Sequence, residues 1–515
     1  MRSTANGSTM QKGKVLFVVI DQIRADALAG SGSNRALAGL VPTPNFDRLR
    51  AESVSFENHF TVTVPCGPAR ASLLTGLYPM NHRSIRNGTP LAHHHATIAS
   101  EARKAGYEPL LFGYTDTTPD PTQFDPNDPE LQGYEKVARG FREVVEMRLE
   151  EGREWPAYLM SKGYDVRPPE DHVLPSLYKP VAPDGGVPAV TDPAMYSAED
   201  SDTAYLTNRT LEAMSARVYE PWFAHVTYIR PHPPFLAPAP YNSMVAPGDV
   251  ALPVLSAPDH PFMDAWFSVP IHKSLFWGFD GDCAGLSQEA AAQVRAIYLG
   301  LIAEVDRHLG RLLDWLDATG QSEDTLVVVT GDHGEMLGDK KMWGKDSVFE
   351  PAYHVPLIIR DPRNPRAAGR KVTAITESVD VTPTILEWIG LTPPPAMDGH
   401  SLTPWIEGGT TAWRDAAFME IDLSHPRKPT RFQLHFGLDE HECNAAILRE
   451  ERWKFVHFNG GVPPMLFDLV ADPDETTNLA GDSAHAGEVS HLMAKMLDRR
   501  MARADRRLTG YAIGD

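Results

Sequence analysis

The chain has 515 residues, 42% hydrophobic and 23% charged, a composition typical of a soluble globular protein that excludes a disordered or fibrous chain. A formal net charge of −20 at pH 7 excludes a general nucleic-acid binder, so an anionic substrate would need a local group of cations or a metal ion. The three cysteines, Cys66, Cys283 and Cys443, are far apart, which argues against a disulfide framework or a cysteine-rich zinc site.

The first apolar run, residues 15–20, is too short for a signal sequence or a membrane span, so we expect a cytoplasmic protein with no membrane partner. Its β-branched residues predict a buried strand that ends at Asp21. Two similar runs, 222–229 and 325–330, are also followed at once by polar residues. Functional residues lie at such carboxyl ends in parallel sheets.

Between the second and third runs, the chain has the pattern of a long helix from a capping Ser287 to Gly320. Its apolar residues recur three or four positions apart, at Val294, Ile297, Leu301, Val305, Leu309, Leu312 and Leu316. The order strand, helix, strand predicts an α/β sandwich.

Residues 115–200 are rich in Pro, Asp, Glu and Gly, which predicts a long insertion that shapes a pocket or an oligomer contact. A proline-rich stretch at 392–395 predicts a passage into a smaller unit. In that unit, 452–458 and 465–469 alternate like antiparallel strands, and 492–501 is typical of a final helix. We therefore expect a catalytic domain over residues 1–400 and a smaller α+β subdomain over 401–515.

The most informative segment is residues 64–76, around Cys66. Pro68 suits an early position in a helix, so Cys66 would face the positive end of that helix, with Arg70 about one turn further on. These local features indicate a corner that favours anions, and they leave open a merely structural buried cysteine. A cysteine phosphatase loop is disfavoured because its Arg follows the Cys at a wider spacing.

Residues 66–70 together with 72–76 resemble the signature of the sulfatase family, in which this cysteine is converted enzymatically to formylglycine. Segments 14–21, 43–49, 330–335, 379–384 and 466–479 resemble further motifs of the same family and span nearly the whole chain. The resemblance implies the α/β sandwich of the alkaline phosphatase superfamily. Such a fold has a central, mostly parallel sheet and a smaller carboxyl-terminal antiparallel subdomain.

Within the family, Asp21-Gln22 and segments 64–70, 77–83, 113–120 and 228–235 resemble phosphonate monoester hydrolases. This implies hydrolysis of phosphonate monoesters and phosphodiesters, with promiscuous sulfatase activity. An arylsulfatase or choline-type sulfatase is the alternative hypothesis. A non-catalytic binding module that keeps the fold is a third, and it predicts an unmodified Cys66 and no metal.

The residues that follow two predicted strands supply ligands for one divalent metal ion. Oxygen and imidazole ligands without thiolate suit manganese or calcium. Singly, these residues could be turn or cap residues, but their joint occurrence with Cys66 favours a metal site. The predicted metal-binding residues are Asp21, Gln22, Cys66 in its modified form, Asp332 and His333.

A hydrated formylglycine carries two hydroxyls, of which one would attack the phosphorus or sulfur centre and the other would later reform the aldehyde and release the product. Among the catalytic candidates, Arg70 should hold the formylglycine region and Lys345 should contact the oxyanion of the substrate. His232 should protonate or hydrogen-bond the leaving group. Further residues predicted to line the substrate pocket are Asn87, Tyr114 and Asp116.

The remaining expectations concern binding partners and a histidine run to which no function is assigned. The expected partners are a small anionic ester as substrate, a formylglycine-generating maturation enzyme, and other copies of the chain in a dimer or tetramer. The run His93-His94-His95 has metal-binding composition but is predicted to be an exposed loop.

Overall fold

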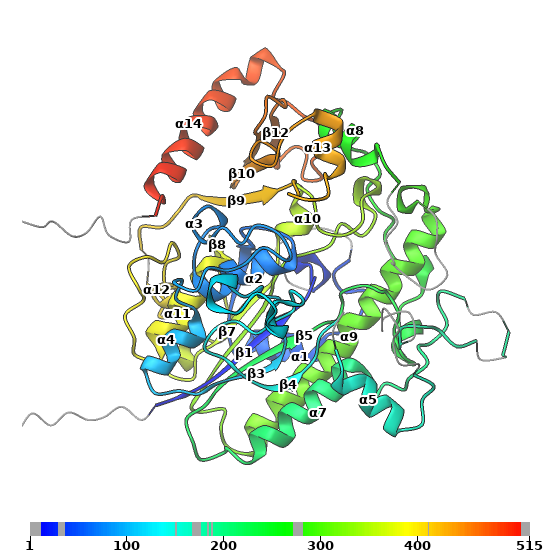
Figure 1. The fold of residues 1–515 in the computed structure, drawn as a ribbon, viewed down its shortest axis with the longest axis vertical. Coiled ribbons are helices and arrows are strands. Elements are labelled where there is room, and N and C mark those ends of the chain that lie inside the picture. Colours follow the sequence, from blue (N-terminus) through cyan, green and yellow to red (C-terminus); the bar gives the residue numbers. More distant parts are fainter. Residues whose placement is uncertain are drawn as a thin grey trace, which may run out of the picture.

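The computed structural model describes residues 12–28, 37–149, 152–166, 177–182, 185–186, 189–270, 282–409 and 411–505. A large sheet runs through the middle of the molecule with helices on both faces, and a smaller sheet lies at one end (Figure 1). This arrangement confirms the predicted α/β class.

The large sheet has eight strands in the order β4-β3-β5-β1-β6-β7-β2-β8. Only β7 runs antiparallel to its neighbours, so the sheet is mostly parallel, as predicted. Its strands are β1 (Lys14–Ile20), β2 (Val54–Phe60), β3 (Pro109–Gly113), β4 (Arg142–Glu146), β5 (Phe223–Tyr228), β6 (Thr325–Gly331), β7 (Leu357–Arg360) and β8 (Arg370–Glu377).

The position of β1 in the sheet explains why its sequence is apolar and does not alternate with polar residues. Its alternate side chains belong to two different cores, one on each face of the sheet, and every residue of the strand is buried. Helices α1 (Pro44–Ala51), α7 (Asp202–Ser215) and α9 (Gln288–Ala318) pack on the face of Leu16 and Val18. Helices α2 (Cys66–Thr75), α4 (Ile98–Lys104), α11 (Val381–Trp388) and α12 (Thr403–Ile406) pack on the face of Val15 and Phe17. A strand covered on both faces reads as a continuous hydrophobic run.

The helices cover the sheet and connect its strands. The predicted long helix is confirmed as α9, and within the described ranges no helix is both long and apolar enough to cross a membrane. The helices are α1 (Pro44–Ala51), α2 (Cys66–Thr75), α3 (Pro79–His82), α4 (Ile98–Lys104), α5 (Glu154–Ser161), α7 (Asp202–Ser215), α8 (Pro261–Phe267), α9 (Gln288–Ala318), α10 (Glu350–Tyr353), α11 (Val381–Trp388), α12 (Thr403–Ile406), α13 (Arg431–Phe436) and α14 (Ala486–Ala502).

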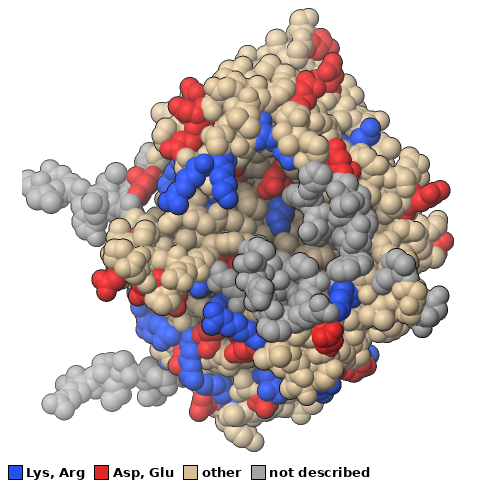
Figure 2. Space-filling model, turned by 45° about the vertical axis from the view of Figure 1, so that its right-hand side comes forward, with Lys and Arg blue, Asp and Glu red and all other residues tan. Residues whose placement is uncertain are grey.

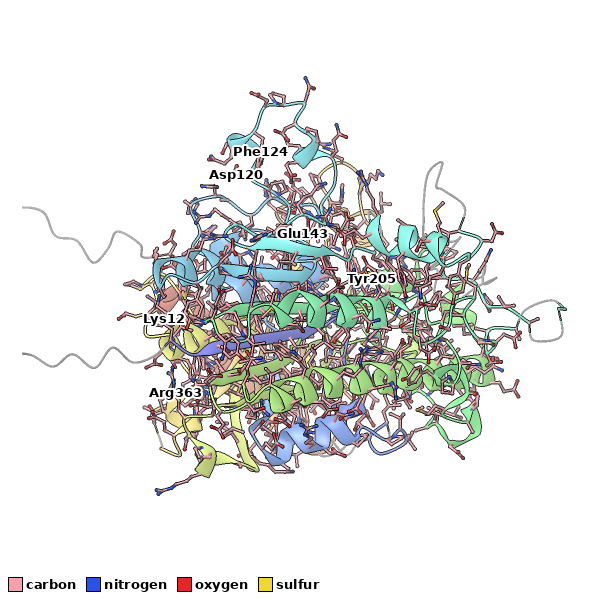
Figure 3. The ribbon with its side chains drawn as sticks, turned by 90° about the horizontal axis from the view of Figure 1, so that it is seen from below. Lys12, Asp120, Phe124, Glu143, Tyr205 and Arg363 are labelled. Carbon is pink, nitrogen blue, oxygen red and sulfur yellow. The ribbon has the colours of Figure 1, made fainter. Side chains whose placement is uncertain are left out.

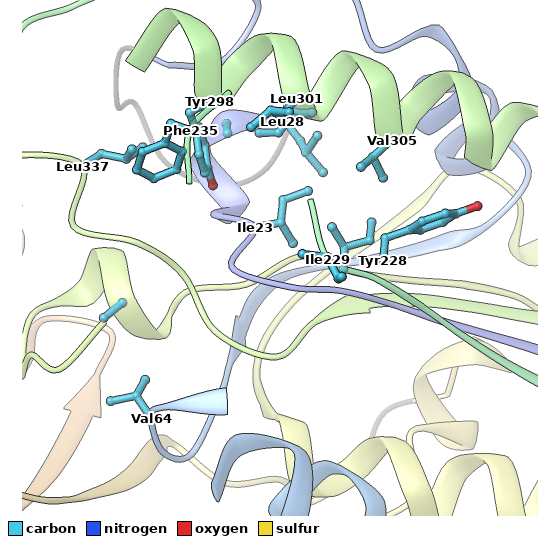
Figure 4. Close-up of a cluster of buried hydrophobic side chains, with 14 of the residues drawn as sticks. Ile23, Leu28, Val64, Tyr228, Ile229, Phe235, Tyr298, Leu301, Val305 and Leu337 are labelled. Carbon is cyan, nitrogen blue, oxygen red and sulfur yellow. The ribbon is translucent and has the colours of Figure 1, made fainter. Parts of the chain in front are cut away.

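Helix α9 supports the edge of the sheet where polar residues follow the strands. Ser287 caps the helix, its side chain accepting a hydrogen bond of 3.1 Å from the backbone N–H of Ala290. In Figure 4, Tyr298 and Leu301 lie across from Ile23, which follows β1, and all three side chains are fully buried. The loop after β1 therefore rests on a packed apolar layer.

The smaller sheet is antiparallel throughout, in the order β12-β11-β10-β9. It contains β9 (Ala416–Asp422), β10 (Asn444–Glu450), β11 (Trp453–Phe458) and β12 (Met465–Asp468). Helix α14 packs against it through Leu492 and Met496. The predicted carboxyl-terminal strands and final helix are thus confirmed, and the division of the chain near residue 400 stays a prediction.

The predicted insertion at 115–200 lies partly outside the large sheet and partly within it. The segment that carries Asp120 and Phe124 projects away from the sheet (Figure 3). Strand β4 then pairs with β3 at the edge of the sheet, so this part of the segment is regular structure. Residues 150–151, 167–176, 183–184 and 187–188 of the insertion lie outside the described residues.

Glu304, in the middle of α9, generates a prediction about stability. The side chain is 0% exposed, and burial, reinforced by Asp202, raises the pKa of its carboxyl to about 8. In the unfolded chain a glutamate has a pKa of about 4.3, so between roughly pH 4.5 and 8 the unfolded state binds fewer protons than the folded state. This group therefore makes the folded protein less stable as pH rises through that window.

Glu304→Gln removes the titrating group and keeps a similar shape. We expect its free energy of unfolding, measured by urea denaturation, to increase relative to that of the wild type as pH rises from about 5 to 8. Glu289→Gln, at an exposed position in the first turn of the same helix, is the control and should show no such trend. A difference between Glu304→Gln and wild type that is constant across this range would contradict the assignment.

Candidate active site

The candidate site lies where four adjacent strands end beside the amino terminus of α2. Strands β3, β5, β1 and β6 are parallel neighbours, so the loops that follow them meet at one edge of the sheet. Ligand sites in open α/β sheets form at this edge. In strand order, these loops carry Tyr114 and Asp116, then His232, then Asp21 and Gln22, then Asp332 and His333.

Cys66 is the first residue of α2 and is only 4% exposed. The next residue, Gly67, donates its backbone N–H to Oδ1 of Asn87 at 2.9 Å. A Cβ atom at position 67 would come within 3.0 Å of that oxygen and 3.2 Å of the carbonyl oxygen of Asp116. The glycine therefore permits the close approach of two predicted pocket residues to the helix start.

The predicted metal-binding side chains converge around the cysteine. The Sγ atom of Cys66 lies 3.1 Å from Nε2 of His333 and 4.0 Å from Oδ1 of Asp21. With a carboxylate oxygen of Asp332, these potential ligand atoms all lie within 4.8 Å of one another, and all four residues are buried. Burial, followed by the carboxylate of Asp21, raises the pKa of the Cys66 thiol well above its ordinary value.

His333 has the tautomer that a metal ligand needs. Its Nδ1–H donates to the carbonyl oxygen of Gly334 at 3.0 Å, which leaves the lone pair of Nε2 facing the cluster. Burial and the nearby Lys345 lower the pKa of His333 to about 3, so the imidazole is neutral. A neutral imidazole oriented through its other nitrogen is the form that binds divalent ions.

Arg70 is the counter-ion of the buried carboxylates. Its Nη2 lies 3.1 Å from Oδ2 of Asp21 and 2.9 Å from Oδ2 of Asp332, and its Nε lies 3.8 Å from Oδ2 of Asp116. The guanidinium stacks on the ring of Tyr114 at 4.2 Å, and the Tyr114 hydroxyl donates to Asp21. Four of the predicted site residues thus form one buried group with Arg70.

Asp116 lies at the back of this group and is 6% exposed. Burial raises the pKa of its carboxyl well above the ordinary value, and Arg70 acts in the opposite direction. Among the described residues, its Oδ1 has no hydrogen-bond partner. A carboxyl that burial favours in its neutral form repels an anionic substrate less than an ionised one would.

Lys345 connects two other predicted residues on the more open side of the cluster. Its Nζ donates to Oε1 of Gln22 at 2.8 Å and to Nε2 of His232 at 2.9 Å. Burial lowers the pKa of Lys345, but the negative groups around it, including Asp21, outweigh burial and raise that pKa above its ordinary value. Lys345 is therefore positively charged near neutral pH. The side chains of Lys345 and His232 remain partly exposed.

His232 is held in a neutral form at both nitrogens. Its Nδ1–H donates to the carbonyl oxygen of Pro233 at 2.6 Å, while Nε2 accepts from Lys345. Burial and the charge of Lys345 lower the pKa of His232 to about 3. A ligand here would contact a histidine and a lysine that are joined by a hydrogen bond, which the lysine donates.

The donor set fits a divalent ion. Among the described residues around Cys66, Asp21 and Asp332 offer carboxylate oxygens and His333 offers an imidazole nitrogen, all within 4.8 Å of one another. Oδ2 of Asp332 is buried and ion-paired with Arg70 without an aligned hydrogen bond. A divalent ion would satisfy such an oxygen.

Glu335 has a position in the site that the sequence did not predict. It is 0% exposed, its Oε1 accepts from the backbone N–H groups of Leu337 at 3.1 Å and Gly344 at 2.5 Å, and its other oxygen accepts from the amide of Gln22. It thus ties Gln22 to the turn that carries Lys345. Its place in the motif at 330–335 was the signal that could have indicated this role.

A recess of about 390 Å³ opens next to the cluster. It is lined by Pro65 and Asp346, the chain neighbours of Cys66 and Lys345, and by the rings of Trp266 and Phe432. In Figure 2, one face of the molecule is hollowed, with basic and acidic side chains inside the hollow. Aromatic walls beside a charged group suit a ligand that has both an organic and an ionic part.

The other singled-out residues lie apart from the cluster. His93 and His94 are exposed as predicted. His95 is buried, at 8% exposed, so for this residue the prediction was wrong; its ring is tilted by 45° against that of His94, with 4.0 Å between ring centroids. Cys283 and Cys443 are free and buried.

The sulfatase family model matches residues 14–391, and a model of the carboxyl-terminal part of N-sulphoglucosamine sulphohydrolase matches residues 338–502. The chain therefore belongs to the sulfatase family of the alkaline phosphatase superfamily, a family of hydrolases that act on ester bonds. This confirms the family indicated by the motif around Cys66.

Three relatives are similar to the chain over almost its whole length. The multifunctional alkaline phosphatase superfamily protein PehA of Trinickia caryophylli is 40% identical, with 98% of each chain covered. The structure of the phosphonate monoester hydrolase SpPMH from Silicibacter pomeroyi is 48% identical with a TM-score of 0.90, covering 97% of each chain. The phosphonate monoester hydrolase of Agrobacterium radiobacter is 40% identical with a TM-score of 0.88 over the same share of both chains.

The convergence of ligands generates a prediction about metal binding. We expect Mn²⁺ or Ca²⁺ to raise the Tm of chelator-treated protein, because an ion that binds only the folded site stabilises it by mass action. His333→Ala should lose most of this shift, as followed by thermal unfolding at increasing ion concentration. His308→Ala, which removes another buried imidazole from α9, should retain the shift. Equal shifts in both variants would contradict a metal site at His333.

Proposed function

We propose that the protein is a metal- and formylglycine-dependent hydrolase of phosphonate monoesters and phosphodiesters with promiscuous sulfatase activity. The observation that carries the proposal is the convergence of Cys66, Asp21, Asp332 and His333 in a buried cluster beside Lys345 and His232. The similarity to two phosphonate monoester hydrolases and to PehA supports the substrate class.

Two groups would complete the site. A divalent ion, manganese or calcium, held by Asp21, Gln22, Asp332 and His333, would polarise the ester oxygens and make a neighbouring hydroxyl more acidic. A hydrated formylglycine at position 66 would supply one hydroxyl to attack the phosphorus or sulfur centre and a second whose deprotonation releases the product and restores the aldehyde. The donor set of the described side chains suits both roles.

The residues of the chain would bind and orient the ester. Arg70 offsets the charge of Asp21 and Asp332, which lets an anionic substrate approach a carboxylate-rich cluster. Lys345 is the described cation that is both close to the cluster and partly exposed, so we assign it to the oxyanion of the substrate. His232 is assigned to the leaving-group oxygen. Because its Nδ1–H is held by Pro233 and its Nε2 accepts from Lys345, the proton for that oxygen would pass from Lys345 to Nε2 and from Nε2 to the oxygen.

Three further residues would shape the substrate pocket. Asn87 lies against the start of α2 through its contact with Gly67. The ring of Tyr114 stacks on Arg70, and the carboxyl of Asp116 lies 3.8 Å from Nε of Arg70. The recess lined by Trp266 and Phe432 would accept the organic group of the ester. The family resemblance further implies a maturation enzyme that modifies Cys66. It also implies a homo-oligomer, either a dimer or a tetramer.

An arylsulfatase or choline-type sulfatase is the alternative proposal, supported by the sulfatase family match itself. We expect turnover of a nitrophenyl phosphonate ester to exceed that of nitrophenyl sulfate in kcat/KM, because the relatives of 48% and 40% identity are phosphonate monoester hydrolases. The two substrates share a leaving group, so the comparison isolates the attacked centre. A clear preference for the sulfate would favour the alternative.

The role of Cys66 has its own test. In protein produced together with a formylglycine-generating enzyme, peptide mass analysis should find the aldehyde at position 66, and Cys66→Ala should abolish turnover of the phosphonate ester while keeping the wild-type Tm. Cys443→Ala, which removes another buried thiol, is the control and should retain activity. A plain thiol at position 66 in active protein, or an active Cys66→Ala variant, would contradict the proposal.

A further inference from the structure

The turn that carries His232 is held by a buried arginine two residues earlier. Nη1 of Arg230 donates to the carbonyl oxygen of His232 at 2.8 Å and to that of Pro234 at 2.9 Å. The side chain of Arg230 is only 1% exposed. One guanidinium therefore spans the backbone on both sides of Pro233, whose carbonyl accepts the Nδ1–H of His232.

Arg230 is in turn anchored by Asp202, the first residue of α7. Nε of Arg230 lies 2.9 Å from Oδ2 of Asp202, and both side chains are buried. The Tyr178 hydroxyl donates to the same oxygen at 3.0 Å, and the ring of Tyr178 stacks on the guanidinium at 4.3 Å. The other oxygen of Asp202 accepts the backbone N–H of Thr203 at 2.7 Å. The arginine is thus fixed against a helix terminus.

We propose that Arg230, held by Asp202 and Tyr178, is a positioning residue that sets where Nε2 of His232 meets Lys345 and the leaving-group oxygen. This rests on the proposed function, in which Nε2 of His232 takes a proton from Lys345 and passes it to that oxygen. The carbonyl oxygens of residues 232, 233 and 234 are all engaged, by Arg230 or by the imidazole itself, so the ring has little freedom to move. A misplacement of about 1 Å in such a group can lower a rate by roughly 100-fold.

Only an arginine can make this set of contacts. Its planar fork presents several N–H donors in fixed directions, whereas lysine has a single ammonium on a flexible stem. Arg230→Lys would keep the positive charge opposite Asp202 but would lose the simultaneous contacts to Asp202 and to the two carbonyl oxygens. This variant separates positioning from the need for a buried charge.

The expected defect depends on the leaving group. In protein matured with a formylglycine-generating enzyme, Arg230→Lys should lower kcat for an alkyl phosphonate ester about 10- to 100-fold, because a poor leaving group needs help from His232. For the nitrophenyl ester of the same phosphonate, whose leaving group needs little help, the loss should be less than about 3-fold. KM for both esters should stay near that of the wild type.

Arg414→Lys is the matched control. Arg414 is also buried and ion-paired, but with Glu377 and Asp380, which lie at and just beyond the end of β8 rather than in the turn of His232. Its replacement should lower Tm and leave the ratio of alkyl to nitrophenyl turnover unchanged. Equal losses on the two esters in Arg230→Lys, or the same ratio change in Arg414→Lys, would overturn the proposal.

Two further variants keep the test decisive if Arg230→Lys does not fold. Tyr178→Phe removes only the hydroxyl on Asp202 and should show a smaller leaving-group-dependent loss in the same direction, and no such loss would overturn the proposal. Arg230→Gly with added guanidinium should recover alkyl ester turnover if the planar donor itself is required, and recovery of the nitrophenyl rate alone would count against it.

The same variants are also assayed with nitrophenyl and alkyl sulfates. These assays distinguish failure of the proposed function from failure of the positioning role of Arg230. Wild-type protein that turns over neither class of ester contradicts the proposed function. Wild-type protein that is active on either class, combined with an Arg230→Lys variant that shows no leaving-group selectivity, contradicts only the positioning role.

Discussion

Burial of several carboxylates around a single guanidinium is the constraint on which the rest of the site depends. Charged groups can be kept away from water only when they are paired, and Arg70 is the ion-pair partner of both Asp21 and Asp332. Two carboxylates that share one guanidinium suit a divalent ion, and a second cation, Lys345, lies on the open side of the cluster. The parallel strands supply the frame, because their carboxyl ends deliver residues more than 300 positions apart to one place.

Much of the fold could be predicted from hydrophobic patterning and local capping. The strands β1, β5 and β6 are buried on both faces, so their sequences are mainly apolar and do not alternate with charged residues. The Ser287 cap marks the start of α9. Strand β4 carries charged residues at the sheet edge and β7 has only four residues, so neither has a clear pattern. The antiparallel direction of β7 depends on pairing between distant segments, which no local pattern encodes.

Only those residues of the candidate site that follow a predicted strand or lie in a family motif could be predicted from the sequence. The side chains near Cys66 could be named, because each follows a strand or lies in a family motif. The supporting contacts of Glu335 and Arg230 could not, because their partners are backbone atoms whose positions depend on how the loops fold. The pairing of His232 with Lys345 was also missed, since 113 residues separate them in the chain. It joins the two side chains by a hydrogen bond that Lys345 donates, where separate roles were expected.

The burial of Cys66 has a consequence for the order of events in the cell. In the folded chain its thiol is 4% exposed and lies under side chains from residues as late as His333. A maturation enzyme of the kind proposed for Cys66 would have to reach this thiol before the side chains around it pack. Its oxidation would then compete in time with closure of the sheet, and chains that close first would keep the unmodified thiol. The yield of working molecules would then be decided by relative rates rather than by equilibrium.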